Sequence, residues 1–188
     1  MGGSRQDRAQ SETVRVTVTI RPERQGDEPA IRHVHAEAFR SREAPADEPP
    51  EVGLVDGLRR SAAWIPELSM VAVVDDAVVG HVVTTRAHVE GDPALVLGPI
   101  GVLPSHQGAG VGSALMEATI EVADHIGEPL IVLLGSTDYY PRFGFVPAAA
   151  IGIIAPHPEW GDNLQALPLH AYHPFAGPVR FPPPFDEL

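Results

Sequence analysis

The sequence predicts an α/β (α+β) domain in which a central sheet is flanked by helices. In several stretches apolar residues recur at every second position, which is typical of half-buried strands, and in others they recur at helical spacing. The two kinds of stretch alternate along the chain, as expected when both pack around a shared core. With 188 residues, 44% of them hydrophobic, the chain is long and apolar enough for one domain of ordinary size.

The N-terminal third predicts one strand followed by two helices. Residues 13–22, "TVRVTVTIRP", are rich in β-branched residues that alternate, which indicates a half-buried strand. Residues 27–39 predict a helix, with Asp27 as its N-cap and Pro29 in its first turn. Residues 51–61 predict a second, weaker helix.

A β-hairpin is predicted over residues 68–89, where two valine-rich runs flank the turn-forming pair Asp75 and Asp76. Residues 94–102, "ALVLGPIGV", predict a further strand. Glycine and proline inside a strand indicate a β-bulge or a close approach of another backbone. In this strand they are Gly98, Pro99 and Gly101.

The second half of the chain predicts a long helix over residues 110–127 and a short buried strand over residues 129–134. One or two helical turns are expected within residues 136–145, then a strand over 148–156 and an edge strand over 177–181. The apolar stripe of the long helix is expected to comprise Val111, Leu115, Ala118, Val122 and Ile126.

Composition and charge exclude several classes of function. Lys and Arg number 13 and Asp and Glu number 25, so the formal net charge is −12, and we expect neither nucleic acid nor membrane as a partner. The chain has no cysteine, and no carboxylate completes a site around its histidines, so no metal is expected. No apolar run approaches the ~20 residues that span a bilayer, and no secretory signal is recognisable, so a cytoplasmic location is expected.

Three segments are predicted from the distribution of these patterns. Residues 1–12 are expected to form a disordered tail, and residues 13–155 the main domain. Residues 156–188 are expected to form a proline-rich C-terminal extension that packs on the same domain through its aromatic residues.

The stretch "LPSHQGAGVGSALMEAT", residues 103–119, has three alternating glycines between a polar loop and a helix, which suggests a phosphate-binding loop. A dinucleotide fingerprint fits poorly, because "LPSHQ" separates the strand from Gly108. A P-loop is excluded because no lysine follows Gly112. A plain tight turn before a helix is a further alternative. The remaining candidate is a pyrophosphate held at the helix N-terminus.

Strand, loop and helix together, "GPIGVLPSHQGAGVGSALM", resemble the core of the GNAT superfamily of acetyl-CoA-dependent N-acetyltransferases. "YYPRFGF", residues 139–145, resembles the closing segment of that family, and "LLGSTDYYPRFGF" is similar to its YhbS-like bacterial branch. The order of predicted elements also matches, so the resemblance covers roughly residues 14–155. It implies a mixed, mostly antiparallel, splayed central sheet flanked by helices, with acetyl-CoA as cosubstrate.

By this resemblance, the pantetheine arm of acetyl-CoA would pair with exposed backbone of the bulged strand, and its pyrophosphate would bind the N–H groups of the glycine loop. A hydroxyl near the start of the helix could add a hydrogen bond. The implied cofactor-binding residues are Ile100, Gly101, Val102, Gln107, Gly108, Ala109, Gly110, Val111, Gly112 and Ser113.

The resemblance also implies a general acid. The family's tyrosine lies four residues before the glycine of a "GF" pair, which corresponds here to Tyr140, with Tyr139 as a packing or substrate-facing neighbour. A tyrosine is suited to protonate the departing thiolate. The alternative is that both tyrosines are aromatic residues of the core.

A general base is not apparent, because residues 94–102 contain no carboxylate, and a water relay is therefore favoured. His81, within an apolar strand, is expected to be a hydrogen-bonded structural residue, and Arg142 is expected to form a structural ion pair. Those residues that could take part in such a relay are Glu67, His81, His88 and Ser136.

The function implied is transfer of an acetyl group from acetyl-CoA to a primary amine of a small molecule or a protein by direct attack. The alternative is a non-catalytic acyl-CoA-binding sensor or regulatory module, which would share the phosphate loop. Residues 40–66 and the proline-rich extension are expected to shape the acceptor site. The oligomeric state, monomer or homodimer, stays open.

Overall fold

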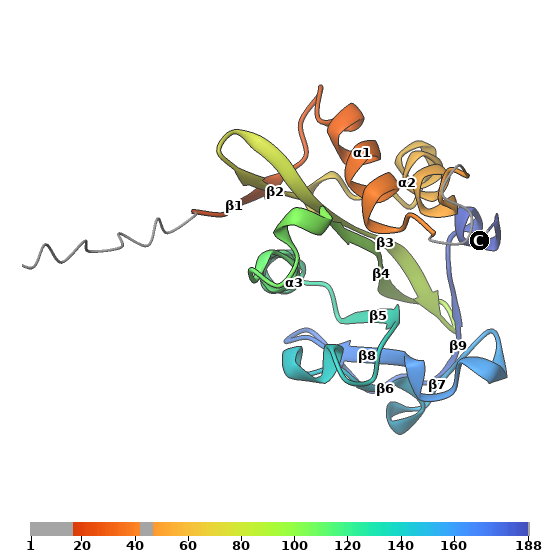
Figure 1. Cartoon of the computed structure of the whole chain (residues 1–188). Helices are drawn as coiled ribbons and strands as arrows, with labels where there is room; N and C mark the ends of the chain where they lie inside the picture. Colours follow the sequence, from red (N-terminus) through yellow and green to blue (C-terminus); the bar gives the residue numbers. More distant parts are fainter. Residues whose placement is uncertain (1–16, 42–46, 188) are drawn as a thin grey trace, which may run out of the picture.

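The structure is a computed structural model that describes residues 17–41 and 47–187. These residues form a mostly antiparallel, open sheet of nine strands flanked by helices, which confirms the predicted fold class. The main path of the sheet runs β1-β2-β3-β4-β5-β8-β6, and β9 pairs with β3 and β7 (Figure 1). The strands are β1 Thr19–Pro22, β2 Ser69–Val74, β3 Ala77–Val89, β4 Asp92–Val102, β5 Leu130–Leu134, β6 Val146–Pro147, β7 Ile153–Ile154, β8 Leu164–Pro168 and β9 Gly177–Arg180.

Helices cover both faces of the sheet (Figure 1). Because side chains alternate along a strand, Val71 and Val83 pack against α1 and α2, whereas Met70 and Val82 pack on the side of α3. The helices are α1 Glu28–Ala38, α2 Pro50–Arg60 and α3 Val111–His125, and the short 3₁₀ helices are η1 Pro66–Leu68, η2 Pro104–His106, η3 Tyr140–Phe143, η4 Ala148–Ile151, η5 Pro158–Asn163 and η6 Pro183–Glu187.

The predicted hairpin is confirmed. β2 and β3 are antiparallel, and the turn residues Asp75 and Asp76 have φ of 47° and 62°. Two consecutive positive φ values define the turn type whose twist matches that of the flanking strands. Beyond the turn, β3 continues to Val89 and pairs with β4, so the hairpin forms the centre of the sheet.

Two local expectations in the N-terminal part are met only in part. The carboxylate of Asp27 makes no cap hydrogen bond to helix α1, although Asp27 occupies the N-cap position. It accepts hydrogen bonds from the N–H of Arg24 at 2.8 Å and, through both of its oxygens, from the Arg21 guanidinium, and this bidentate pair holds the carboxylate away from the helix N–H groups. The strand expected over residues 13–22 is described only as β1, Thr19–Pro22, and the tail expected over residues 1–12 lies outside the described residues.

Two expectations in the second half also need correction. Ile126, placed in the apolar stripe of the long helix, is 43% exposed, because α3 ends at His125 and Ile126 lies past its last turn. The strand expected over residues 148–156 is a 3₁₀ helix, η4, followed by only two strand residues in β7. Three successive alanines, Ala148 to Ala150, give the start of η4 no β-branched side chains to favour an extended backbone.

The sequence did not predict β8, whose pattern "LQALP" is short and ends in proline. β8 pairs with β5 along its whole length and also with β6, so the chain beyond residue 155 supplies part of the sheet. Residues 156–187, named here the C-terminal segment, return through β9 to β3 and end beside α2 (Figure 1). Pro184 of η6 packs on Gly57 of α2.

No helix within residues 17–41 or 47–187 is long and apolar enough to cross a membrane.

Candidate functional site

The centre of the site is β4, which contains the predicted bulge. The register between β3 and β4 shifts at this place. Val82 of β3 faces Ile100 of β4, whereas Thr84, two residues further along β3, faces Leu97, three residues away on β4. The extra residue on β4 falls at Gly98 and Pro99, which confirms the bulge expected from glycine and proline inside this strand.

Beyond the bulge, β4 and β5 separate. These parallel strands pair only where Leu95 faces Ile131 and Val96 faces Val132. Residues 97–102 have β3 on one edge, and no strand of the described chain pairs with them on the β5 side. The backbone of residues 100–102, predicted to contact a cofactor, therefore borders an opening in the sheet where an extended ligand could pair as an added strand.

The glycine loop leads from this opening into α3. Gly108 and Gly110 have φ of 75° and 85°, and no heavy atom lies within 4 Å of where a Cβ would be at either residue. Gly110 is the N-cap of α3, whose first turn carries no acidic side chain. Gln107 donates a hydrogen bond from Nε2 to the carbonyl of Val102 at 2.9 Å, which ties the loop to the end of β4. Free N–H groups, open space and the helix dipole make this loop suited to an anion.

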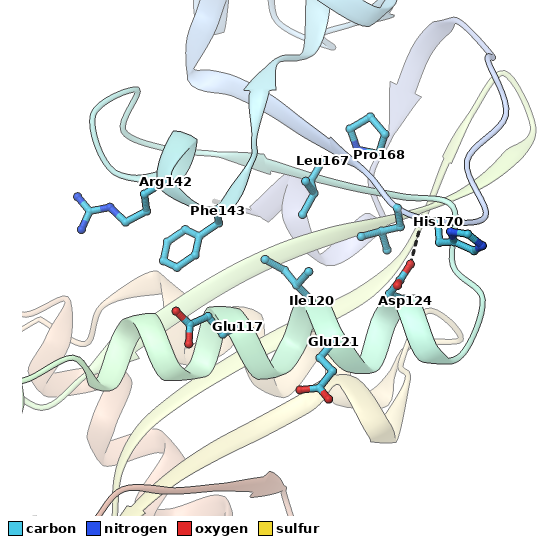
Figure 2. Close-up of a pocket in the computed structure, with 10 residues that line it drawn as sticks. Glu117, Ile120, Glu121, Asp124, Arg142, Phe143, Leu167, Pro168 and His170 are labelled. Atoms are coloured by element: carbon cyan, nitrogen blue, oxygen red, sulfur yellow. Dashed lines mark hydrogen bonds between the residues drawn. The ribbon is translucent and has the colours of Figure 1, made fainter.

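A groove of about 560 Å³ runs beside α3, between this helix and η3 and β8 (Figure 2). Phe143 and Leu167 form part of its apolar lining. Its α3 side carries Glu117, Glu121 and Asp124, and Asp124 accepts a hydrogen bond from the N–H of His170 at 2.8 Å. Three carboxylates along one wall disfavour phosphate, so the glycine loop is the better place for a polyanion.

The two adjacent tyrosines face different parts of the site. The Tyr139 hydroxyl lies 3.3 Å from where a Cβ of Gly112 would be, so Tyr139 reaches the start of α3. Tyr140 instead lines a large cavity on the other side of the opening. Their rings pack edge to face with centroids 5.0 Å apart. Burial, with a smaller contribution from Tyr139, raises the pKa of Tyr140 above its usual value, so its hydroxyl carries a proton at neutral pH.

Gly135 positions Tyr140, and sequence reasoning missed this residue. A Cβ at Gly135 would overlap the Tyr140 ring, so only glycine leaves room for the ring in this orientation. The signal was present in the sequence, because Gly135 directly follows β5 and precedes the segment that carries both tyrosines.

The large cavity has a volume of about 1040 Å³ and opens beside Leu97, Gly98, Pro99 and Ile100 of β4. The other walls come from Phe39 just after α1, from α2 and from the C-terminal segment, and α2 and this segment belong to the parts of the chain expected to shape the acceptor site. Residues of these elements that line the cavity are Phe39, Glu51, Leu54, Pro156, His157, Trp160, Val179, Arg180, Phe181, Phe185 and Asp186.

The four residues proposed for a proton relay are scattered. Glu67 lies exposed on η1, and His88 lies exposed at the far end of β3 opposite Arg180. Ser136 follows β5, and its carbonyl accepts the N–H of Tyr139 at 3.2 Å. None of these side chains lines the large cavity. His81 is fully buried and hydrogen-bonded, which confirms the structural interpretation of that residue.

His81 belongs to a buried polar network that joins α1 to the sheet. Glu23 accepts a hydrogen bond from the Ser69 hydroxyl at 2.5 Å, so the Ser69 oxygen accepts from Nε2 of His81 at 2.9 Å. Nδ1 of His81 then accepts from Nε2 of His35 at 2.8 Å. Nδ1 of His35 is buried without a partner and faces Gly101, where a Cβ would come within 3.2 Å. The network thus fixes α1 against β2 and β3, with His35 beside Gly101 of β4 at the edge of the opening.

The electrostatics of the network favour neutral histidines. Burial, followed by the neighbouring His81 and Arg59, lowers the pKa of His35 to about 3. Burial also lowers the pKa of His81, by more than the nearby Glu23 carboxylate raises it. Burial alone would raise the pKa of Glu23, but hydrogen bonds from His81, Arg59 and Ser69 outweigh it and lower that pKa to about 2.

Acidification should therefore destabilise the protein before its carboxylates titrate. The unfolded chain binds a proton on each histidine near pH 6.5, whereas folded His35 stays neutral to about pH 3, so stability falls as pH drops below 6.5. Between pH 7.5 and 5.0 we expect a loss of about 2 kcal/mol from His35 alone, with a further loss from His81. Urea unfolding at both pH values measures it. The variant His35→Gln should lose less stability between the two pH values, and the control variant His88→Gln should lose as much as the unsubstituted protein. Equal stability of the unsubstituted protein at both pH values would contradict the assignment of His35 and His81 as neutral.

Arg142 does not form the predicted ion pair with any described residue. Its Nε donates to the carbonyl of Tyr139 at 2.8 Å, and its guanidinium lies 4.5 Å from the centre of the Tyr139 ring. The aromatic ring supplies the negative face that a carboxylate would otherwise provide. Within residues 17–41 and 47–187, no group of three His, Cys, Asp or Glu side chains is arranged to hold a metal ion.

Comparison with known proteins gives a consistent result. The family model described as the acetyltransferase (GNAT) family matches residues 30–145. The uncharacterized N-acetyltransferase YjhQ of Escherichia coli K12 is 38% identical over 113 residues, which cover 57% of this chain and 62% of YjhQ. The match therefore spans less than two thirds of that relative.

Two solved structures are similar over most of their length. The GNAT family N-acetyltransferase YhbS from Escherichia coli, in complex with CoA, superposes with a TM-score of 0.81 at 25% identity, covering 91% of this chain and 93% of YhbS. A GNAT family acetyltransferase from Brucella melitensis, in complex with acetyl-CoA, has a TM-score of 0.73 at 32% identity, covering 90% of this chain and 99% of that one.

Proposed function

The chain belongs to the GNAT acetyltransferase family, and from this premise we propose that it transfers the acetyl group of acetyl-CoA to a primary amine. The observation that carries the proposal is the opening beside residues 97–102, which has the glycine loop on one side and the large cavity with Tyr140 on the other. A cosubstrate held by the loop could reach an acceptor in the cavity through this opening.

The glycine loop and the unpaired edge of β4 support acetyl-CoA as the ligand. Its pyrophosphate would accept hydrogen bonds from N–H groups of the loop, Gln107 to Ser113, where the two glycines with positive φ leave open space. Both similar structures are complexes, one with CoA and the other with acetyl-CoA. The pantetheine arm would pair with the backbone of Ile100, Gly101 and Val102, which has no strand partner on the β5 side.

The chemistry requires a neutral amine, a polarised thioester and a proton for the leaving group. The amine nitrogen attacks the carbonyl carbon, and a backbone N–H near Val102 stabilises the oxyanion that forms. The C–S bond then breaks, and Tyr140 donates its hydroxyl proton to the departing thiolate while the nitrogen loses a proton. The raised pKa of Tyr140 supports this role, because it keeps the hydroxyl protonated until the thiolate forms.

A non-catalytic acyl-CoA sensor is the second candidate. It is favoured by the lack of a carboxylate within residues 94–102, and it would use the same phosphate loop. The two functions differ in one observable, since only an enzyme releases free CoA thiol in proportion to an added amine. A panel of primary amines incubated with acetyl-CoA, with free thiol as the readout, separates them.

Ligand selectivity tests the loop assignment independently of turnover. CoA and acetyl-CoA should raise the melting temperature, and at a concentration 100-fold above Kd the stabilisation should be about 2.7 kcal/mol. NAD and ATP should have no effect, because the loop lacks both the dinucleotide fingerprint and the P-loop lysine. Differential scanning fluorimetry with the four ligands measures this. Stabilisation by NAD or ATP but not by CoA would contradict the assignment.

A further inference from the structure

The large cavity contains chemistry that the transfer reaction itself does not explain. No residue of the loop 104–113 lines it, so it is separate from the proposed phosphate site. It reaches β4 at residues 96–100 and extends from there between Phe39 just after α1, α2 and the C-terminal segment. Phe185 packs against the cores under both α2 and the C-terminal segment, which closes the cavity at that end. An acceptor must occupy this space to meet a thioester beside β4.

One wall of the cavity is a row of aromatic rings from the C-terminal segment. Trp160 and Phe181 are stacked with centroids 5.8 Å apart and planes 18° apart. Phe181 and Phe185 follow at 5.4 Å, and His157 lies 4.9 Å from Trp160 at the other end of the row. The Trp and Phe rings are half-buried, so each keeps accessible surface toward the cavity that it lines. Such a wall favours a flat ring, which can stack on it or meet it edge to face.

The charges on the lining favour a cation. Glu51 comes from the first turn of α2 and Asp186 from η6, and these two elements are in contact. Neither carboxylate has an ion-pair or hydrogen-bond partner within the described residues. Arg180 is the one guanidinium on the lining, so the two carboxylates and this guanidinium together have a formal charge of −1. The net charge of −12 on the whole chain acts in the same direction.

We propose that the acceptor is a primary amine carried on a flat, apolar ring. The ring lies against Trp160, Phe181 and Phe185, and Glu51 and Asp186 attract the ammonium form into the cavity. This inference rests on the proposed function, because it assigns the acceptor of the same reaction. It excludes acceptors whose reactive amine lies on a long polar chain, since they would leave the aromatic wall without a ligand.

A matched set of amines tests the proposal. Acetyl transfer from acetyl-CoA is measured with 2-phenylethylamine and tryptamine as ring-bearing amines, with spermidine as a polycation without a ring, and with a lysine-containing peptide as a protein-like amine. We expect kcat/KM to be about tenfold higher for the ring-bearing amines, which is the upper end of what a single aromatic pair provides. Equal or greater kcat/KM for spermidine or the peptide would overturn the inference while leaving the proposed acetyl transfer intact.

Variants locate the effect in the cavity. Trp160→Leu and Phe181→Leu should each raise the KM for 2-phenylethylamine about tenfold and leave the KM for acetyl-CoA unchanged. Phe175→Leu is the matched control, because this half-buried aromatic residue of the same segment does not line the cavity. Glu51→Gln, which alters no packing, should raise the KM for the amine several-fold. An unchanged amine KM in all three cavity variants would place the acceptor elsewhere.

Binding without turnover keeps this inference separate from the proposed function. In a Trp64→Phe background the fluorescence of Trp160 reports on the cavity alone, since the chain has two tryptophans. Titration with 2-phenylethylamine in the presence of CoA should change this signal, and spermidine should not. No change with 2-phenylethylamine would overturn the acceptor assignment. If CoA fails to bind while the amine still changes the fluorescence, the result contradicts the proposed function and leaves the amine-binding site in the cavity supported.

Discussion

Tyr140→Phe is expected to lower kcat by roughly 10²- to 10⁴-fold while leaving the affinity for acetyl-CoA nearly unchanged. The hydroxyl matters only when the thiolate forms, so its removal affects the transition state more than the ground state. The phenylalanine ring keeps the contacts with Tyr139 and Phe145 and still fits over Gly135, so the melting temperature should hardly move. Initial rates at varied acetyl-CoA concentration, with an accepted amine, measure the effect.

Tyr139→Phe is the matched control for this variant. Its hydroxyl lies near Gly112 and does not line the large cavity, so its loss should cost far less in kcat. Full kcat in Tyr140→Phe would remove the acid role and return Tyr140 to the core aromatics. A collapse of both acetyl-CoA binding and stability would show that Tyr140 is structural, which would favour the sensor.

Gly110→Glu is expected to abolish binding of acetyl-CoA. Gly110 is the N-cap of α3, with open space where its Cβ would be, and a glutamate there would place a negative charge and bulk where the pyrophosphate should bind. Isothermal titration calorimetry should detect no binding in the variant, and circular dichroism should show that it folds. Unchanged affinity in the folded variant would rule out this loop as the phosphate site.

Strain at Gly110 needs its own control, because its φ of 85° disfavours side chains. Gly110→Asn introduces a side chain that tolerates this conformation and carries no charge. We expect Gly110→Asn to weaken binding much less than Gly110→Glu. Equal losses in the two variants would indicate that backbone strain, rather than charge at the anion site, determines the effect.

Local patterns predicted those parts of the fold that depend on neighbouring residues. The pair Asp75 and Asp76 predicted the hairpin, since a two-residue turn with positive φ favours antiparallel pairing of the two strands that flank it. Glycine and proline inside a strand predicted the bulge at Gly98 and Pro99 in the same way. The roles of Gln107, the glycines of the loop and Tyr140 stay predictions that the experiments above decide.

Long-range contacts account for what the sequence did not predict. The alternation of apolar and polar residues in β8 is too short to predict a strand. β8 is stabilised by its pairing with β5, some 30 residues earlier in the chain. The path of the C-terminal segment depends on β9 pairing with β3 and on Pro184 packing against Gly57, so its aromatic wall could not be placed from local periodicity. His35 and His81 are likewise 46 residues apart, and no local pattern joins them.

The most direct test of the account is the stoichiometry of a single reaction. Acetyl-CoA and 2-phenylethylamine are incubated with the protein, and free CoA thiol and acetylated amine are quantified together by mass spectrometry. We expect both products to form in a one-to-one ratio, neither to form without the amine, and Tyr140→Phe to slow both equally. The contradicting result is a protein that binds acetyl-CoA in the same solution yet acetylates neither this amine nor any other in the panel.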